Sequence, residues 1–214
     1  MDVILDNIPR YVDGAVVTIQ LTLLSFFFAF LIGLTVAACR VSPVPPLQRA
    51  GALYTQLARN TPLTVLMVLA LFGLPDVGFL FGFFPTAVGV LSIYTGAFLA
   101  ETFRSGINSV AVGQGEAARA IGLGFGRVLT LIVLPQALRT VVAPIASLFI
   151  ALAKNTSVAY VIGVVELTGI GRVIGNPIGR PLEALLGSAL GYLILLIPAG
   201  LLFGVLERRV AIVR

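Results

Sequence analysis

The sequence predicts an all-α, multi-pass membrane protein, a helical bundle of about five transmembrane helices. Three observations predict this fold class: 58% of the 214 residues are apolar, only 11% are charged, and the mean hydropathy is +1.07. Soluble domains contain about one quarter charged residues, and so apolar a chain could not cover its own surface in water. A bilayer-spanning helix takes about 20 apolar residues, so residues 1–214 are expected to form a single transmembrane domain.

Two apolar segments and a basic connection make up the first third of the chain. Residues 15–39 contain no charged residue and are long enough to span a bilayer. A connection rich in Pro and Arg follows, with a short helix expected over 47–57. Pro62 suits the start of a second span because its missing backbone N–H is not needed there. This span is expected to run to about Leu74, where Pro75, Asp76 and Gly78 break it.

The remaining spans flank a long polar loop. A third span is expected from residue 85 to residue 100 or 103, a fourth over 141–165, and a fifth from residue 182 or 184 to residue 206. Residues 104–139 are more polar and contain six glycines, which predicts a folded loop of short helices. A Gly-rich connection with two prolines joins the fourth span to the fifth.

The distribution of basic residues predicts the orientation. Ten arginines lie in the first connection, in the long loop and at the C-terminus, whereas three lie on the opposite side. By the positive-inside rule the first side is cytoplasmic, which places the N-terminus outside and the C-terminus inside. The net charge of +5 is thereby explained by topology, and nucleic-acid binding is not expected. The ten residues are Arg40, Arg49, Arg59, Arg104, Arg119, Arg127, Arg139, Arg208, Arg209 and Arg214, and the three are Arg10, Arg172 and Arg180.

The composition argues against an enzyme. The chain has no His and one Cys, so metal-ligand clusters, a disulfide framework and His-dependent nucleophilic catalysis are not expected. The only Lys is followed by Asn155, so the chain contains no phosphate-binding loop of the GxxxxGK[ST] type. We therefore expect a non-catalytic membrane subunit without a cofactor of its own.

The long loop contains a pattern of helix, glycine and helix. Residues 116–121 are good helix formers, Gly122 favours a left-handed turn, and residues 125–134 resume an apolar helical pattern before Pro135. Such a pair of short helices could dock in a groove of a soluble partner or lie in the membrane interface. Composition alone leaves both interpretations open.

The spacing within this loop resembles the EAA signature of permeases from ATP-binding-cassette importers. That signature is Glu-Ala-Ala, three residues, Gly, nine residues, Ile, one residue and Leu-Pro. Every fixed position is occupied, by Glu116, Ala117, Ala118, Gly122, Ile132, Leu134 and Pro135. The resemblance implies a coupling helix that contacts a dimer of ATP-binding subunits, which would bind ATP and Mg. The residues implied in this contact are Gly113, Glu116, Ala117, Ala118, Gly122 and Gly124.

Further motifs extend the resemblance over nearly the whole chain, to the polar amino acid uptake permeases. They are Arg59-Asn60-Thr61-Pro62-Leu63, Arg104-Ser105-Gly106-Ile107, Leu134-Pro135-Gln136-Ala137-Leu138-Arg139 and Lys154-Asn155-Thr156-Ser157. Residues 40–44 and 122–126 look most like the glutamate-uptake branch. The resemblance implies a bacterial cell-membrane location, a second permease that is identical or homologous, and an extracytoplasmic substrate-binding protein.

Lys154 stands out on physical grounds, because it lies near the middle of the expected fourth span. An ionised residue there costs about 2.5–3.5 kcal/mol and should face protein or a water-filled path. It could pair with Glu101 or Glu166, and Glu101 could also pair with Arg104 three residues on. Alternatively, it could line a translocation route. The candidate residues of that route are Glu101, Lys154, Asn155, Thr156 and Ser157.

Two other functions fit the sequence less well than an importer permease. An ion-coupled secondary transporter or channel is disfavoured because five spans do not divide into two equal halves and no acidic residue lies in the middle of a span. A purely structural subunit would have no need for a lysine at mid-membrane depth. In the fifth span, the pairs Gly187/Gly191 and Gly200/Gly204 predict close helix packing, either within the bundle or with another subunit.

Overall fold

The computed structural model describes residues 2–210, which form helices joined by short connections; Arg214 lies outside the described residues. No strand occurs in this part of the chain. The elements are α1 (Asp2–Leu5), α2 (Ile8–Val41), α3 (Pro45–Asn60), α4 (Leu63–Asp76), α5 (Phe83–Asn108), α6 (Val112–Ala120), α7 (Phe125–Arg127), a π-helical segment (Val128–Val133), α8 (Leu134–Asn155), a 3-10 segment (Thr156–Ile162), α9 (Leu167–Gly175) and α10 (Pro181–Val210).

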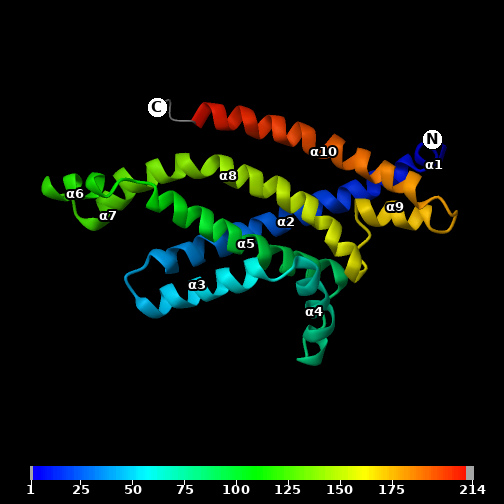
Figure 1. Cartoon of the computed structure of the whole chain (residues 1–214), viewed down its shortest axis with the longest axis horizontal. Helices are drawn as coiled ribbons and strands as arrows, with labels where there is room; N and C mark the ends of the chain where they lie inside the picture. The colour runs from blue at the N-terminus through cyan, green and yellow to red at the C-terminus, as the bar shows by residue number, and fades with distance from the viewer. Residues whose placement is uncertain (1, 211–214) are drawn as a thin grey trace.

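The long helices run roughly side by side and give an elongated bundle (Figure 1). Helix α5 lies between α3 and α8 and packs extensively on α2, while α10 lies along α8 and α9. The loop with α6 and α7 stands at one end of the bundle, together with the connection between α2 and α3. The N-terminus and α9 lie at the other end. The connection between α2 and α3 and the long loop, which hold most of the arginines assigned to the cytoplasm, thus lie at the same end of the bundle, and the orientation stays a prediction.

The prediction of about five membrane spans is confirmed. In residues 2–210, four helical stretches are long and apolar enough to cross a membrane: Ile8–Val41, Phe83–Asn108, Phe125–Ile162 and Pro181–Arg208. A fifth span results if α3 and α4, which are bent by 103° at the break between them, count as one. Figure 1 shows α4 projecting away from the bundle at this bend.

The second span ends later than predicted, because Pro75 does not stop it. Helix α4 continues to Asp76 and closes at Gly78, which adopts a left-handed φ of +88°. There the N–H of Gly78 donates to the carbonyl of Pro75 and the N–H of Phe79 to that of Leu74. This is the usual glycine-dependent helix stop, and Gly78 was among the residues expected to break the span.

Two boundaries around the fourth span were also predicted wrongly. Pro135 does not separate the loop from the span: it lies at the start of α8, directly after the π-helical segment, and the helical run continues through it. At the other end, α8 stops at Asn155 and the chain continues as a 3-10 helix, so Lys154 lies in the last turn of α8 and not in mid-span. The connection after this span contains the helix α9. This helix was not predicted, because its glycines favour a loop.

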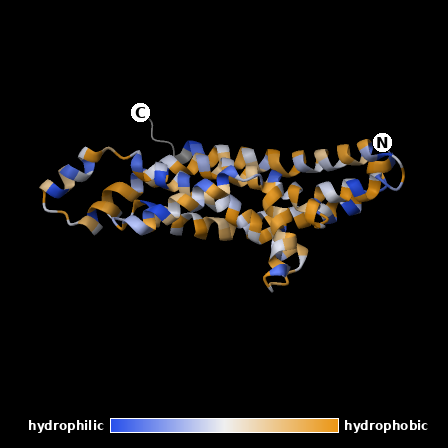
Figure 2. Ribbon diagram, turned by 60° about the horizontal axis from the view of Figure 1, so that its bottom comes forward, coloured by the Kyte–Doolittle hydropathy of each residue, from blue (hydrophilic) through white to orange (hydrophobic). Residues whose placement is uncertain are grey.

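Helix α5 forms the centre of the bundle, whereas α10 lies on its surface. The most apolar 18-residue window of α5 is 61% buried, and that of α10 is 0% buried. Large apolar side chains such as Phe27, Phe72 and Ile194 point outward, and Figure 2 shows hydrophobic residues spread over the bundle and α4. A surface of this kind suits lipid.

The glycine pairs of α10 serve packing within the subunit where they have a neighbour. A Cβ at Gly187 would lie 2.6 Å from the ring of Tyr11, and one at Gly191 would lie 2.9 Å from Leu167. Gly204 has no atom within 4 Å of such a Cβ. The first pair therefore holds α10 against α2 and α9.

Candidate coupling surface and transport route

The loop between α5 and α8 folds around one glycine. Helix α6 ends at Ala120, and Gly122 adopts a φ of +87°. The N–H of Gly122 donates to the carbonyl of Arg119 at 3.0 Å, and the N–H of Leu123 donates to that of Ala118 at 3.1 Å. These two bonds form the Schellman stop, which favours glycine because a Cβ is strained at positive φ. The predicted left-handed turn at Gly122 is therefore confirmed.

The residues of the Glu-Ala-Ala motif do not all face the same way. Glu116 and Ala117 are exposed, whereas Ala118 is 5% exposed and packs inward. Gly113, Gly122 and Gly124 are exposed, and a Cβ at any of them would meet no atom within 4 Å. The surface available to a partner therefore consists of Glu116, Ala117 and the three glycines, with Ala118 beneath it.

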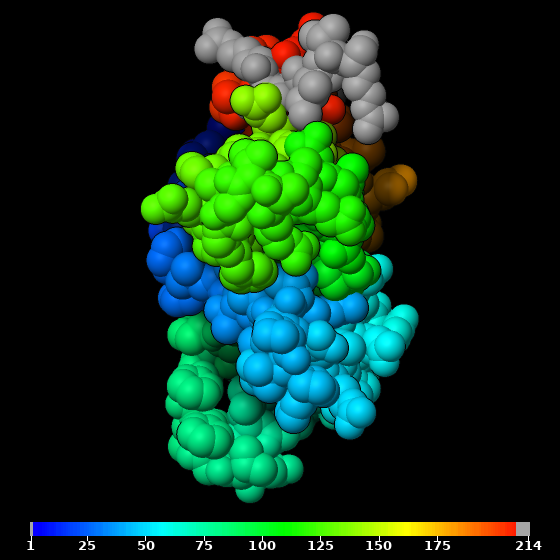
Figure 3. All heavy atoms as spheres, turned by 90° about the vertical axis from the view of Figure 1, so that its left-hand side faces the viewer, coloured from blue at the N-terminus to red at the C-terminus, as the bar shows by residue number. Residues whose placement is uncertain are grey.

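Large apolar side chains surround these exposed residues. Val112 is 74% exposed, and Ile121 and Phe125 are each 80% exposed. They lie on short elements outside the bundle, at the end of the molecule that Figure 3 faces, where the loop (green) bulges above the start of α3. Exposed apolar residues next to charged ones indicate a protein-binding or interfacial surface.

The loop is connected to the bundle by a continuous helical rod. From Phe125 the chain runs through the π-helical segment and α8 to the 3-10 segment without a break, over 38 residues to Ile162. Helix α6 packs on the π-helical segment, where Val128 is 7% exposed. The loop and the far end of α8 therefore belong to one continuous helical run. π-Helical turns within α-helices are rare and often mark functional sites.

Lys154 lies at the far end of this rod, on the surface. Neither carboxylate considered as its partner is available, because Glu101 binds arginines and Glu166 binds backbone N–H groups and a tyrosine. Within residues 2–210 Lys154 forms no ion pair. The structure thus excludes pairing with Glu101 or Glu166 and leaves an exposed ammonium group.

The three residues after Lys154 differ in their access to solvent. Asn155 is half-buried, and Thr156 is fully buried with its hydroxyl donating to the carbonyl of Ala153 at 2.7 Å. The hydroxyl of Ser157 donates to the carbonyl of Lys154 at 2.8 Å. Of this motif, Lys154 is the most exposed residue, while Thr156 helps to close the helix end.

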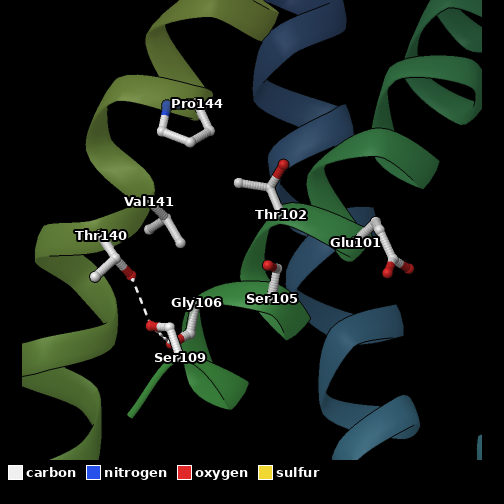
Figure 4. Close-up of a pocket in the computed structure, with 8 residues that line it drawn as sticks. All are labelled: Glu101, Thr102, Ser105, Gly106, Ser109, Thr140, Val141 and Pro144. Carbon is white, nitrogen blue, oxygen red and sulfur yellow. Dashed lines mark hydrogen bonds between the residues drawn. The ribbon is translucent and has the colours of Figure 1, made fainter.

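Lys154 belongs to an exposed stripe of α8 that is poor in large apolar residues. Thr140, Pro144 and Ser147 are exposed and recur with Lys154 at helical spacing. Between this stripe and α5 lies a cavity of about 290 Å³. It is lined by Glu101, Thr102, Ser105, Gly106, Ser109, Thr140, Val141 and Pro144. In Figure 4 the hydroxyls of Ser109 and Thr140 meet across it, at 3.4 Å.

Glu101 is the centre of a charge network and not a free carboxylate. One of its oxygens accepts from Arg40 of α2 and the other from Arg104 of its own helix, while Arg59 of α3 lies 4.0 Å away. Figure 4 shows its carboxylate turned away from the cavity hydroxyls. The predicted pair with Arg104 is confirmed. The pair with Arg40 was missed, because 61 residues separate the two in sequence.

A second buried carboxylate, Glu166, organises the opposite end of the molecule. It is fully buried at the N-cap of α9, where it accepts hydrogen bonds from the N–H groups of Thr168 and Gly169 and from the hydroxyl of Tyr192. Burial raises the pKa of Glu166, and these hydrogen bonds oppose the rise. The sequence signal that could have revealed this role is an acidic residue directly before a short helix.

The family of the chain follows from comparison with known proteins. Residues 29–212 match the family described as the binding-protein-dependent transport system inner membrane component. The chain belongs to this family. The resemblance found in the EAA loop is thereby confirmed, and the chain is a multi-pass membrane permease of the ATP-binding-cassette importer type.

Relatives of this permease match over almost their whole length. The glutamate transport system permease protein GluC of Corynebacterium efficiens is 39% identical over 217 residues, covering 95% of each chain. The probable glutamine ABC transporter permease protein GlnM of Bacillus subtilis is 34% identical over 209 residues, covering 98% of this chain and 97% of the relative.

Solved structures agree with the permease fold. The crystal structure of an amino acid ABC transporter with histidines superposes with a TM-score of 0.91 and 29% sequence identity, over 96% of both chains. The inward-facing MetNI methionine ABC transporter shares the fold at a TM-score of 0.78 and 23% identity, over 94% of this chain and 96% of that one. The predicted all-α membrane fold is thereby confirmed.

Proposed function

We propose that this permease imports a polar amino acid, glutamate, as one of two permease subunits in a complex with a dimer of ATP-binding subunits. ATP and Mg would bind on those subunits, and the permease would have no catalytic role. Relatives named for glutamate and for glutamine systems support an amino acid substrate. The 39% identity to the glutamate permeases covers 95% of this chain, whereas a glutamine permease with the same identity covers 77%, and this favours glutamate.

One observation carries the coupling part of the proposal, the exposed surface of the loop. Val112, Ile121 and Phe125 are at least 74% exposed beside Glu116, on elements that lie outside the bundle. Burying these three side chains would favour association, because each apolar side chain of this size contributes about 1.5–3 kcal/mol when fully buried. We infer that the ATP-binding subunits cover this surface, with Gly113, Ala117, Gly122 and Gly124 allowing close approach.

The exposed stripe of α8 supports a second permease, identical or homologous. A lysine facing lipid costs several kcal/mol unless it reaches protein, water or the interface. Pairing two subunits along α8 and α5 would place Lys154, Ser147 and the hydroxyl-lined cavity in a shared, hydrated space. A substrate would then pass between the subunits. Asn155, Thr156, Ser157 and Glu101 would shape this route from beneath the surface.

The orientation of the bundle completes the proposed cycle. We place the coupling loop and C-terminus in the cytoplasm and the N-terminus with α9 outside, where an extracytoplasmic binding protein would deliver substrate. Closure of the ATP-binding subunits would move the two loops, and the rod from Phe125 to Ile162 would carry that motion to Lys154. Each nucleotide state must bind one permease conformation more tightly for this cycle to do work.

The first test is uptake by the reconstituted complex. The permease, co-expressed with its ATP-binding subunits, is placed in liposomes, and uptake of radiolabelled glutamate is measured with the binding protein present. We expect uptake that requires ATP and persists when ion gradients are collapsed. Uptake that follows an ion gradient without ATP would instead support a secondary transporter.

Substitution of Lys154 tests the route. Lys154→Met is expected to reduce uptake strongly, about tenfold or more, while the complex still assembles and hydrolyses ATP, because the change removes a charge that no other residue uses. Arg49→Met, at an exposed position of α3 without an ionic partner among the described residues, is the control. Wild-type uptake by Lys154→Met would contradict the proposed route.

A further inference from the structure

The π-helical segment Val128–Val133 joins the loop to α8 with a wider turn than the helix that follows it. The N–H of Leu134 donates to the carbonyl of Leu129, five residues back, and not to that of Thr130, four residues back. The turn therefore contains one residue more than an α-helical turn. In a continuous α-helix, the side chains before the segment would point about 100° away from their present direction relative to α8.

Pro135 gives a physical reason for the wider turn. It is the second residue after the segment and has no backbone N–H. In an α-helix its ring would collide with the carbonyl of Leu131, four residues before it, and a wider turn moves that carbonyl away. The carbonyls of Thr130 and Leu131 lose their usual α-helical donors, since Leu134 donates to Leu129 and Pro135 has no N–H.

A proline alone does not impose this wider turn. Pro144 lies within α8 and Pro198 within α10, and the turns before both are α-helical. Each of these two is followed by an apolar residue, whereas Pro135 is followed by Gln136. The Nε2 atom of Gln136 donates to the carbonyl of Ile132 at 2.9 Å. This bond spans the proline and provides a donor where the backbone has none.

The packing around the segment leaves open space on two sides. One cavity, of about 440 Å³, lies towards α6, and its lining includes Val128, Leu129 and Gly115. Another, of about 240 Å³, lies towards α2 and α5, and its lining includes Leu129, Leu34 and Phe103. A tightly packed interior fixes one arrangement of its side chains. Because this segment is not enclosed in that way, its local hydrogen bonds decide between the π-helical and the α-helical register.

From these observations we propose that Pro135 and Gln136 are positioning residues for coupling, an inference that rests on the proposed function. They hold residues 128–133 in the π-helical register and so set the direction in which the loop presents Glu116 to the ATP-binding subunits. In an α-helical register, the residues before the segment would turn by about 100° and shift by about 1.5 Å relative to α8. The loop, which is also joined to α5, would then have to reorient.

The ratio of amino acid imported to ATP hydrolysed by the reconstituted complex tests the role of Gln136. Gln136→Leu should lower this ratio about fivefold, because a hydrogen bond that holds the register is lost, while the ATP-binding subunits still co-purify. Gln136→Arg should restore most of the ratio, because an arginine can donate to a carbonyl four residues back, as Arg119 does to Gly115 at 3.3 Å. Gln48→Leu is the matched control. The Nε2 atom of Gln48 also donates to a backbone carbonyl, that of Ser42 at 2.6 Å, outside the loop.

Pro135→Ala supplies the missing N–H and tests the register directly. A cryo-EM structure of the variant complex should show an α-helix through residues 128–138, with the N–H of Leu134 donating to Thr130. The ratio of import to ATP hydrolysis should fall as in Gln136→Leu, and adding Gln136→Leu to Pro135→Ala should lower it no further. Pro198→Ala, in the exposed helix α10, is the control and should leave both the register and the ratio unchanged.

The outcomes separate this inference from the proposed function. A wild-type ratio in Gln136→Leu would overturn it, as would equal losses in Gln136→Leu and Gln136→Arg, since a packing defect predicts no rescue by a donor. Loss of assembly in Gln136→Leu would also overturn it, because it indicates a structural role. A π-helical register that persists in Pro135→Ala would show that the proline does not set it. If Pro135→Ala does not assemble, the two Gln136 variants decide. Failure of the wild-type complex to import any amino acid would instead reject the proposed function.

Discussion

The two ends of the bundle differ in how many of their polar and apolar groups find partners within the subunit. At the end with α9, hydrogen bonds join segments far apart in sequence. Tyr11 donates to the carbonyl of Ala184 at 2.7 Å, and Ser188 donates to that of Leu167 at 2.7 Å. The N–H of Leu167 donates to the hydroxyl of Thr18 at 3.2 Å.

Within the loop of residues 112–130, by contrast, the side-chain hydrogen bonds are local. Arg119 donates to the carbonyl of Gly115 at 3.3 Å, and Thr130 donates to that of Gly126 at 2.8 Å. The α9 end is therefore held together by contacts within one subunit, whereas the loop end leaves large apolar side chains and glycines exposed. Substitutions in the loop should therefore affect binding of a partner, whereas substitutions at the α9 end should affect the stability of the subunit.

The largest expected effect is loss of assembly from Glu116→Arg. Reversing the charge of an exposed residue at the centre of the loop surface should prevent docking of the ATP-binding subunits, because mismatched charges at an interface cost several kcal/mol. The amount of co-purified ATP-binding subunit should fall about tenfold or more. Co-purification in mild detergent measures this.

The matched control for Glu116→Arg is Asp76→Arg, another charge reversal at an exposed position, at the end of α4. It should leave the recovered amount of ATP-binding subunit unchanged. If both variants retain the wild-type ratio of subunits, the loop is not the docking surface, and the difference between the two ends loses its functional meaning.

The same contrast explains what the sequence could predict. The spans are visible because their residues are apolar over long stretches, and the stop at Gly122 is visible because glycine favours positive φ. The network of Glu101 with Arg40 was not predictable, because nothing local brings residues 61 positions apart into contact. Likewise, the 3-10 segment after Lys154 has the same apolar composition as a continued helix.

Helix α9 is a second element that amino-acid composition does not predict. Its three glycines argue against a helix by propensity, but they allow close packing. A Cβ at Gly175 would lie 2.6 Å from the Cα of Pro181, and one at Gly169 would lie 2.9 Å from the ring of Tyr160. Tertiary packing and the Glu166 cap outweigh the propensity, and the packing cannot be predicted from one sequence.

The next largest effect is loss of stability from Glu166→Ala at the α9 end. The change removes the acceptor for two backbone N–H groups and for the Tyr192 hydroxyl, all within a buried site. We expect a cost of about 2–4 kcal/mol, because a cap and hydrogen bonds to a carboxylate are lost together. Thermal unfolding in detergent measures it, with the exposed Glu207→Ala as control. Equal melting temperatures for the two variants would show that Glu166 does not hold this end together.

A smaller effect is expected from a matched pair of glycine substitutions. A Cβ at Gly171 of α9 would collide with Ser188 and lie 3.0 Å from the carbonyl oxygen of Ala184, whereas one at Gly113 of α6 meets nothing within 4 Å. Gly171→Ala should therefore cost about 1–3 kcal/mol through overpacking. Gly113→Ala should be neutral or slightly stabilising in the isolated subunit, because alanine favours the helix by about 1 kcal/mol. Melting temperatures that rank the other way would contradict the difference in packing between the ends.

The smallest expected effect is local, at the left-handed turn of the loop. Gly122 has a φ of +87°, so Gly122→Ala should strain the stop of α6 by about 1–2 kcal/mol. Gly124 has an ordinary φ of −68°, so Gly124→Ala is the matched control. Since the loop packs on little else, the melting temperature of the subunit should not change in either variant. Amide hydrogen exchange of α6 should rise about 5- to 30-fold in Gly122→Ala, as that free energy implies, and Gly122→Asn should show a smaller rise because asparagine tolerates this conformation better. Unchanged exchange in Gly122→Ala would mean that the loop is held by contacts beyond its own turn, and the two ends would then be more alike than their hydrogen bonds indicate.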